Sequence, residues 1–211
     1  MSAAVTELPE DSAAEGTETL PQRRRLAWLM VVTGAVGFFA AAMLVWERLQ
    51  IYVDAGHVSS CDLNSLVNCG TVMRTSQAAA FGFPNPLIGI VAYAIILTIA
   101  TAMLAGARLA RWYWWCVQIG VTLGFVFICW LWYQTTFRID ALCLYCMIVW
   151  IMQTTLFVHV TVHNMRTGVI PVPRRVASAM TGWAWFLTVM ILLVLFGIIF
   201  IRFFSVITGM F

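Results

Sequence analysis

The sequence predicts an all-α membrane protein, and three observations support that class. Of its 211 residues, 62% are hydrophobic and only 10% are charged, whereas soluble domains are about half apolar and about a quarter charged. Five uncharged stretches each exceed 20 residues, and a helix needs about 20 apolar residues to cross a bilayer. The net charge of +3 is small and the arginines lie beside apolar stretches, so we expect a lipid bilayer, and no nucleic acid, around this chain.

The first element is an N-terminal segment that we expect to be a disordered, acidic tail over residues 1–25. Residues 1–22 contain five acidic side chains and many small polar ones, so apolar burial cannot offset the entropy of ordering them. The segment does not resemble a signal peptide, because the apolar stretch after it begins too late, is too long and lacks an obvious cleavage site.

Five membrane-spanning helices are expected to follow. Proline suits the first turn of a helix, so the second helix should begin near Pro86 rather than at the start of its apolar stretch. The predicted organisation is a four-helix domain over 26–165 with a long loop at 47–85, and then a connecting loop and a fifth helix over 166–211. The uncharged stretches are 26–46, 75–107, 112–137, 141–165 and 176–201.

The arginines predict an orientation in the membrane. Eight of them lie before the first helix or in the connections between helices two and three and helices four and five, and four lie at the opposite ends. The arginine-rich side should be cytoplasmic. We therefore expect a multi-pass protein of the cell (inner or plasma) membrane, with a cytoplasmic N-terminus and with the loops 47–85 and 138–140 outside. The eight are Arg23, Arg24, Arg25, Arg108, Arg111, Arg166, Arg174 and Arg175.

Four of the six cysteines fall on the expected outer side, where disulfides persist. They form two pairs, in the stretches CDLNSLVNCG and DALCLYC: Cys61 with Cys69, and Cys143 with Cys146. Cys116 and Cys129 lie within the third helix, about 20 Å apart along its axis. We expect these last two to be ordinary buried thiols.

The pair at the start of the fourth helix has a spacing suited to thiol–disulfide chemistry. Cys143 and Cys146 lie one turn apart on one helix face, close enough for a constrained and reducible disulfide. The N–H groups of a first helical turn favour a thiolate. Asp140, which we expect to cap the helix through the N–H of Cys143, would oppose that thiolate.

Structural roles for these cysteines compete with a redox role. A staple between positions 143 and 146 would close a very short loop and stabilise little. A four-cysteine zinc site fits the spacing but not an oxidising compartment, and a c-type haem would need histidine where the chain has Met147. Taken alone, the pair of Cys61 and Cys69 is explained as well by a plain loop disulfide as by a redox role. With both pairs on one side, a relay through a mixed disulfide is favoured.

Three stretches together resemble the vitamin K epoxide reductase family in its stand-alone bacterial form: CDLNSLVNCG (61–70), FGFPNPLIG (81–89) and DALCLYC (140–146). The resemblance covers residues 26 to about 165. It implies a four-helix bundle around a quinone site, to which the fifth, C-terminal helix is an addition. It also implies a quinone of the menaquinone or ubiquinone type. Because fused members carry a thioredoxin-like domain where this chain ends, it implies a separate DsbA-like thioredoxin-fold partner.

The resemblance also implies roles for individual residues. Cys146 would face the quinone, Cys143 would exchange its disulfide with Cys69, and Cys61 would meet the cysteine of the partner. Asn85 matches an asparagine of the family that hydrogen-bonds a quinone carbonyl, and its alternative role is to cap the helix that begins at Pro86.

Two aromatic residues complete the implied site. Trp150 occupies the position at which vertebrate members carry a tyrosine at the quinone. A hydrogen bond from Trp150 to the quinone would therefore differ in kind from the bond that the tyrosine makes. Phe83 and Trp150 could form walls around the quinone ring, and ordinary packing is the alternative for both. No metal is expected.

The sequence therefore predicts a quinone-dependent thiol–disulfide oxidoreductase. It would reoxidise a secreted DsbA-like partner and so drive disulfide formation in exported proteins. A DsbB-type enzyme also has four helices and two cysteine pairs, but its Cys-x-x-Cys lies in the first outer loop, whereas here it comes second. A non-enzymatic membrane scaffold with two structural disulfides would fit the same pattern, and so would vitamin K epoxide reduction itself.

Overall fold

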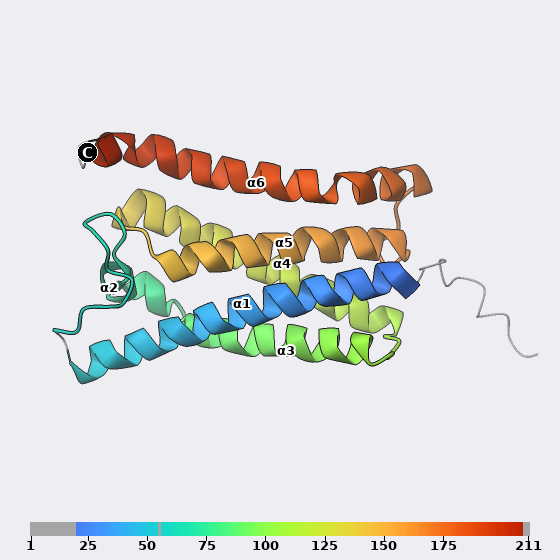
Figure 1. Cartoon of the computed structure of the whole chain (residues 1–211), viewed down its shortest axis with the longest axis horizontal. Helices are drawn as coiled ribbons and strands as arrows, with labels where there is room; N and C mark the ends of the chain where they lie inside the picture. Colours follow the sequence, from blue (N-terminus) through green and yellow to red (C-terminus); the bar gives the residue numbers. More distant parts are fainter. Residues whose placement is uncertain (1–19, 55, 209–211) are drawn as a thin grey trace, which may run out of the picture.

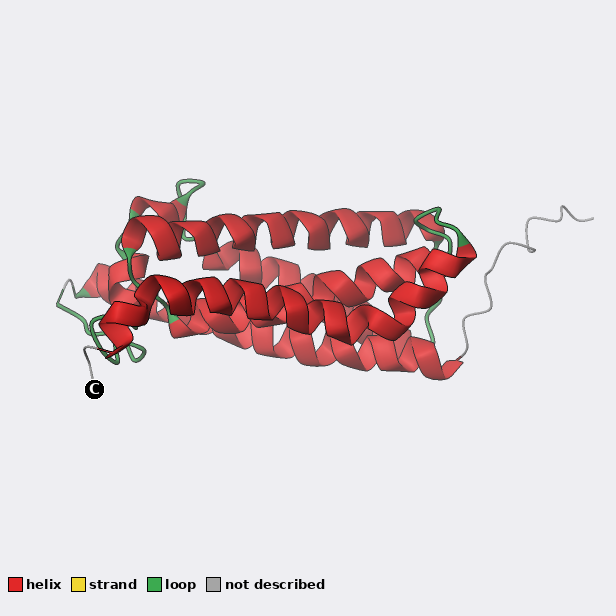
Figure 2. Cartoon of the chain, turned by 90° about the horizontal axis from the view of Figure 1, so that it is seen from above, coloured by secondary structure: helices red, strands yellow, loops and turns green. Residues whose placement is uncertain are grey.

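The structure, a computed structural model, describes residues 20–54 and 56–208 (Figure 1). Within these residues five helices are long and apolar enough to cross a membrane, which confirms the predicted all-α membrane fold and its fifth helix. They run side by side along the long axis of the molecule in both views (Figure 1 and Figure 2). The five are α1 (Leu20–Val53), α3 (Pro86–Leu104), α4 (Arg111–Gln134), α5 (Leu144–Arg166) and α6 (Arg174–Thr208).

Helix α5 is the centre of the arrangement. It contacts α1, α4 and α6, while α1 also packs along α3. Small residues allow the closest approach between α1 and α3: a Cβ added at Gly37 would lie 2.5 Å from the ring of Tyr93. Such close packing of small residues is a main source of helix association in membranes, where apolar burial alone gives little driving force.

Helix α1 is longer at both ends than the sequence predicts. It begins at Leu20, so residues 20–25 of the expected disordered tail are helical, while residues 1–19 lie outside the described part of the chain. At this end Arg23 donates to the carbonyl of Ala107 (2.7 Å). At the other end the helix continues through 47–53, where the sequence predicts loop, because buried Glu47 is bonded there by the following loop.

The bundle has two different ends. The start of α1, the α3–α4 turn and the α5–α6 turn lie together at one end (Figure 1), which we call the arginine-rich end because it carries the eight arginines named above. The opposite end carries residues 56–85 and 135–143, and we call it the loop end. It contains α2 (Cys69–Met73) and a 3₁₀ turn, η1 (Ser76–Ala79).

The connection from α4 to α5 brings the chain to the cysteines. A π-helical turn, η2 (Thr135–Ile139), extends α4, and Asp140 follows in the left-handed conformation with φ of 55°. This residue reverses the chain, so residues 141–143 run back in an extended form to the start of α5. Helix α3 begins at Pro86, as the sequence predicts.

Candidate functional site: a cysteine cluster beside an apolar cavity

The loop that carries Cys61 and Cys69 is shaped by its own side chains. Asp62 accepts hydrogen bonds from the N–H of Gly70 (2.9 Å) and the N–H of Ser59 (3.1 Å). Asn64 accepts from two successive N–H groups, those of Leu66 and Val67, in a turn typical of asparagine. These bonds close the loop so that its two cysteines lie side by side.

A short backbone bridge joins this loop to the segment before α5. Val67 and Leu142 form a parallel bridge, in which the N–H of Asn68 donates to the carbonyl of Leu142 (2.9 Å) and the N–H of Leu142 to the carbonyl of Leu66 (2.8 Å). Asn68 also caps α2, because its side chain accepts from the N–H of Thr71. The bridge therefore fixes Cys69, at the start of α2, relative to Cys143.

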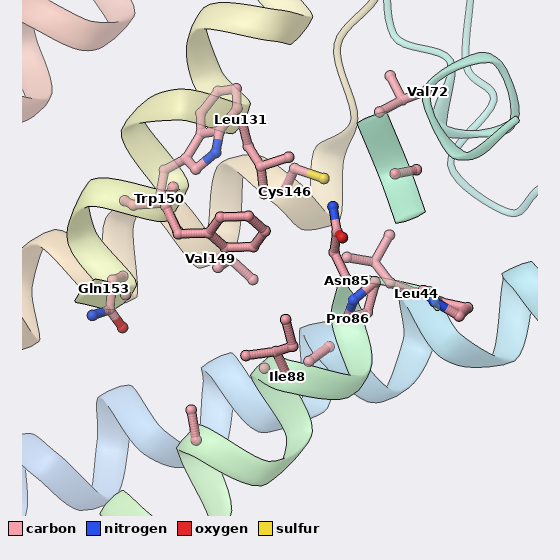
Figure 3. Close-up of a pocket in the computed structure, with 18 of the residues that line it drawn as sticks. Leu44, Val72, Asn85, Pro86, Ile88, Leu131, Cys146, Val149, Trp150 and Gln153 are labelled. Atoms are coloured by element: carbon pink, nitrogen blue, oxygen red, sulfur yellow. The ribbon is translucent and has the colours of Figure 1, made fainter. Parts of the chain in front are cut away.

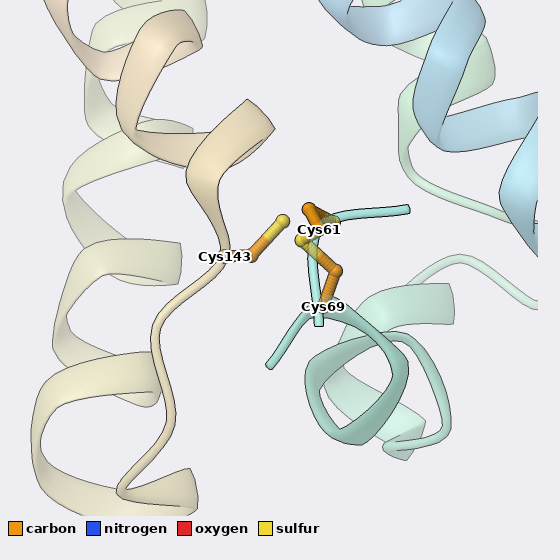
Figure 4. A group of neighbouring side chains, drawn as sticks. All are labelled: Cys61, Cys69 and Cys143. Atoms are coloured by element: carbon orange, nitrogen blue, oxygen red, sulfur yellow. A yellow bond between two sulfur atoms is a disulfide. The ribbon is translucent and has the colours of Figure 1, made fainter. Parts of the chain in front are cut away.

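Three sulfur atoms meet at this bridge. Cys61 and Cys69 form a disulfide, and the Sγ of Cys143 lies with theirs so that all three are within 4.8 Å of one another (Figure 4). Cys143 and Cys146 are both thiols. The cluster is shielded from solvent: Cys61 is 2% exposed, and Cys69 and Cys143 are 0% exposed.

Hydrogen bonds favour the thiolate of Cys143. The Cys146 thiol and then the N–H groups of Cys146 and Tyr145 lower its pKa, although burial and the Asp62 carboxylate act in the opposite direction. The expected cap from Asp140 is wrong: Cys143 has no side-chain cap, and Asp140 instead pairs with Arg202 (3.0 Å). The reason is its left-handed backbone, which ends η2 rather than starting α5.

A cavity of about 150 Å³ lies on the other side of Cys146. A cavity of that size with apolar walls can admit one six-membered ring. Figure 3 shows Cys146 and Asn85 approaching the same space from α5 and from the start of α3. The lining is almost entirely apolar and comes mainly from α1, α3, α4 and α5, with further residues from α2 and η1. Its members with polar side-chain atoms are Arg48, Asn85, Tyr93, Thr135, Cys146 and Gln153.

Asn85 lies at the cavity wall with its side-chain amide bonded to the loop. Its Oδ1 accepts from the N–H of Ala80 (3.0 Å), and its Nδ2 donates to the carbonyl of Gln77 (2.7 Å). Asn85 occupies the N-cap position of α3, as its alternative role requires, but its side chain makes no capping bond to the helix. Because an amide nitrogen has two N–H groups, one remains available beyond the bond to Gln77.

The structure brings only one of the two predicted aromatic walls to this cavity. Trp150 lines it and is buried, one turn after Cys146 on the same face of α5. Phe83 is 43% exposed and is not part of the lining. Phe127 of α4 lines the cavity instead and contacts Phe81, which in turn stacks on Phe83.

The remaining cysteines lie on α4, away from this cluster. Cys116 is exposed and Cys129 half-buried, so the expectation that both are buried is wrong. In a spanning helix a small thiol can face lipid as readily as the core, because both surroundings are apolar.

Sequence reasoning missed one buried group beside the cluster. Glu47 accepts from the N–H of Ser60 (3.1 Å), next to Cys61, and its other oxygen is 2.9 Å from Nε2 of His57. The Ser60 hydroxyl also bonds the hydroxyl of Tyr145 (3.2 Å). The available signal was an acid directly after the uncharged stretch 26–46, since such groups are costly near a bilayer unless they have partners.

This arrangement suits thiol–disulfide exchange. A thiolate beside a disulfide can attack it and form a mixed disulfide. The three sulfurs are also close enough to ligate one metal ion, but a metal needs thiolates, and two of these sulfurs are joined to each other. The four cysteines thus form a continuous path from the loop to the cavity.

Comparison with known proteins gives one result. The search of curated proteins found no match. The model of the vitamin K epoxide reductase family matches residues 28–161, a segment that contains most of α1, all of α2 to α4, most of α5 and the four cysteines of the two pairs. The match confirms the resemblance seen in the sequence, and the chain therefore belongs to the vitamin K epoxide reductase family.

Proposed function

We propose that this protein is a quinone-dependent thiol–disulfide oxidoreductase that oxidises a secreted DsbA-like, thioredoxin-fold partner. The observation that carries the proposal is the meeting of three sulfurs within 4.8 Å, with the fourth, that of Cys146, facing an apolar cavity. Membership of an oxidoreductase family whose members generally depend on quinone supports it.

Electrons would pass first from the partner to the loop pair. A thiolate of the partner attacks Cys61 and releases Cys69, and the second partner thiol then displaces Cys61. The partner leaves oxidised and the loop pair holds two electrons as two thiols. The short Sγ distances to Cys143 make Cys69 a suitable attacking group for the next exchange.

The second exchange would move the electrons to α5. The Cys69 thiolate attacks Cys143 in a Cys143–Cys146 disulfide and releases Cys146; Cys61 then displaces Cys143 and restores the loop disulfide. The product has a loop disulfide and two thiols on α5, which is the combination present in this structure.

The cavity has the properties that a quinone ring requires. It has the volume of a single ring, apolar walls and a buried amide at Asn85 that can donate to a carbonyl oxygen. Quinone supplies the electron sink, since it takes up two electrons and two protons and leaves as quinol. Cys146 faces that sink, and the favoured thiolate of Cys143 is placed to close the α5 disulfide afterwards.

The membrane orientation is part of the proposal. The arginine-rich end would be cytoplasmic and the loop end would face outward, where a secreted partner and an oxidising compartment are found. The protein would thus be a multi-pass protein of the cell membrane that drives disulfide formation in exported proteins.

Quinone reduction by the detergent-purified protein, with dithiothreitol as electron donor, tests the proposal. We expect wild type to bleach the oxidised-quinone absorbance and Cys146→Ala to be slower by about 1,000-fold or more, as for loss of a reacting group. Cys116→Ala, an exposed cysteine of α4, is the matched control and should retain full activity. If wild type fails to turn over while dithiothreitol reduces at least one pair, a scaffold with structural disulfides is the better explanation.

A further inference from the structure

The fifth spanning helix, α6, lies entirely beyond the residues matched by the family model. It nevertheless packs along α5, the helix that carries Cys146 and Trp150 (Figure 1). At the loop end α6 directs side chains inward: Ile199 and Phe203 are buried and Phe196 is half-buried. Phe200, one turn after Phe196, is instead 53% exposed.

The inward side chains of α6 belong to the buried cluster that backs the cavity wall. That cluster joins residues of the cysteine loop, the segment before α5, α4, α5 and α6. It consists of Leu66, Ile128, Leu142, Trp150, Ile199 and Phe203, with Phe196 and Cys146 among the side chains packed against it. Helix α6 therefore reaches the same cluster as the residues that form the site.

Trp150 connects α6 to the cavity by a direct ring contact. Trp150 lines the cavity, and the ring of Phe196 lies 6.4 Å from it, tilted by 57°. Only 1% of Trp150 is exposed, so its ring is confined between the cavity and its packing partners. Without Phe196 the indole would have space to move away from the cavity.

A second contact joins α6 to the segment that carries Cys143. Arg202 pairs with Asp140 (3.0 Å), the left-handed residue that turns the chain toward Cys143. Both side chains of this pair are about half exposed, so the pair contributes little by itself. The apolar contact at Phe196 is the stronger one.

From these contacts we infer that the loop-end half of α6 is part of the electron-acceptor site, with Phe196 as a positioning residue that holds Trp150 against the bound ring. The inference rests on the proposed function, because it assigns the cavity to the quinone. It extends the site beyond the four-helix core that the family model covers.

Two phenylalanines of α6 provide a matched test. Phe196→Ala and Phe200→Ala remove the same side chain one turn apart, from a half-buried and an exposed position respectively. With dithiothreitol as donor and a short-chain quinone as acceptor, we expect Phe196→Ala to raise the KM for quinone about tenfold, as a misplaced wall residue would, with a smaller change in kcat. Phe200→Ala should keep the wild-type KM.

Rescue separates positioning from a general loss of stability. Phe196→Leu refills part of the space and should return the KM most of the way to wild type. Phe196→Val refills less of it and should keep a raised KM, so it replaces Phe196→Ala if that variant does not fold. Thermal unfolding of each variant in detergent is measured alongside. A wild-type KM in Phe196→Ala, or in Phe196→Val where the alanine variant does not fold, would overturn the inference, and so would an equal rise in Phe200→Ala. A wild type that reduces no quinone would instead overturn the proposed function.

Discussion

The two cysteine pairs lie close together and differ in almost every other respect. Cys61 and Cys69 are joined in a disulfide and lie in a loop shaped by polar side chains and backbone bonds. Cys143 and Cys146 are thiols at the start of a membrane-spanning helix, and Cys146 borders an apolar cavity. The difference suggests a division of labour, in which the loop pair serves a donor from water and the helix pair an acceptor from lipid.

The two pairs also differ in whether the structure must open before they can react. The loop disulfide is almost fully shielded, so a thiol of a protein partner cannot reach Cys61 while the segment before it stays in place. In that segment, Ser60 and His57 form hydrogen bonds with Glu47, and the Ser60 hydroxyl also bonds Tyr145. Access to the loop pair therefore requires these bonds to open, whereas Cys146 of the helix pair already lines the cavity.

The largest expected effect distinguishes the two cysteine pairs by the electron donor that each can use. Cys61→Ser removes the group assigned to the partner and leaves Cys143, Cys146 and the cavity intact. We expect oxidation of a reduced DsbA by this variant to fall to background, while quinone reduction with dithiothreitol persists. Partner oxidation is followed by alkylating its free thiols. Cys116→Ser is the control for removal of a thiol, and wild-type activity of Cys61→Ser toward the partner would contradict the order of the relay.

A smaller effect is expected at the cavity. Asn85→Asp keeps an acceptor for the N–H of Ala80 but loses the donor to the carbonyl of Gln77. It also loses the second N–H, which we propose donates to a quinone carbonyl. Loss of a donor at a buried site costs about 1–3 kcal/mol, so the KM for quinone should rise by about 5- to 150-fold.

Asn64→Asp is the matched control for Asn85→Asp. The side chain of Asn64 acts as an acceptor for the N–H groups of Leu66 and Val67, and an aspartate can replace it in that role. Steady-state kinetics with varied quinone measures both variants. Equal KM values for Asn85→Asp and wild type would remove Asn85 from the quinone site.

A further prediction concerns the bonds that close the loop. Glu47→Gln retains an acceptor for Ser60 but loses the charge that faces His57. A hydrogen bond contributes about 1 kcal/mol net, or about fivefold in an opening equilibrium. We expect dithiothreitol to reduce the loop disulfide about fivefold faster, as measured by timed alkylation. Asp54→Asn, an exposed carboxylate that accepts from the N–H of Gly56, should reduce at the wild-type rate.

The five helices and the position of both cysteine pairs could be predicted from the sequence, whereas the contacts around the loop pair could not. Apolar length predicted the five helices, Pro86 predicted the start of α3, and spacing together with the charge pattern placed both cysteine pairs at one end. The role of Glu47 could not be predicted, because its partners lie ten and thirteen residues away in a loop without periodicity.

The directions of individual side chains were the other feature that the sequence predicted only in part. The family resemblance implied Trp150 as a wall of the quinone site, and Trp150 lines the same cavity as Cys146. Phe83 lies in a loop where no periodicity gives its direction, and it is absent from the lining that Phe127 completes. The predicted cap from Asp140 failed because its left-handed backbone, which short polar residues tolerate, depends on the α4–α5 connection as a whole.

The smallest predicted effect tests why the helix pair differs from an ordinary pair of thiols. The Cys146 thiol is the main cause of the lowered pKa of Cys143, ahead of the N–H groups of Cys146 and Tyr145. Replacing Cys146 with alanine removes that bond but not the N–H groups, so the pKa of Cys143 should rise and its thiolate should form only at higher pH. The ultraviolet absorbance of the thiolate, recorded against pH in a background of Cys116→Ser and Cys129→Ser, measures it.

Tyr145→Phe is the control in the same background, because the backbone N–H of residue 145 donates whichever side chain follows it. Its titration should match that of the parent. If Cys146→Ala also titrates like the parent, the bond between the two thiols does not set the acidity of Cys143. The thiolate would then owe its stability to the first turn of α5 alone, and the two sulfurs of the helix pair would act independently until they meet the acceptor.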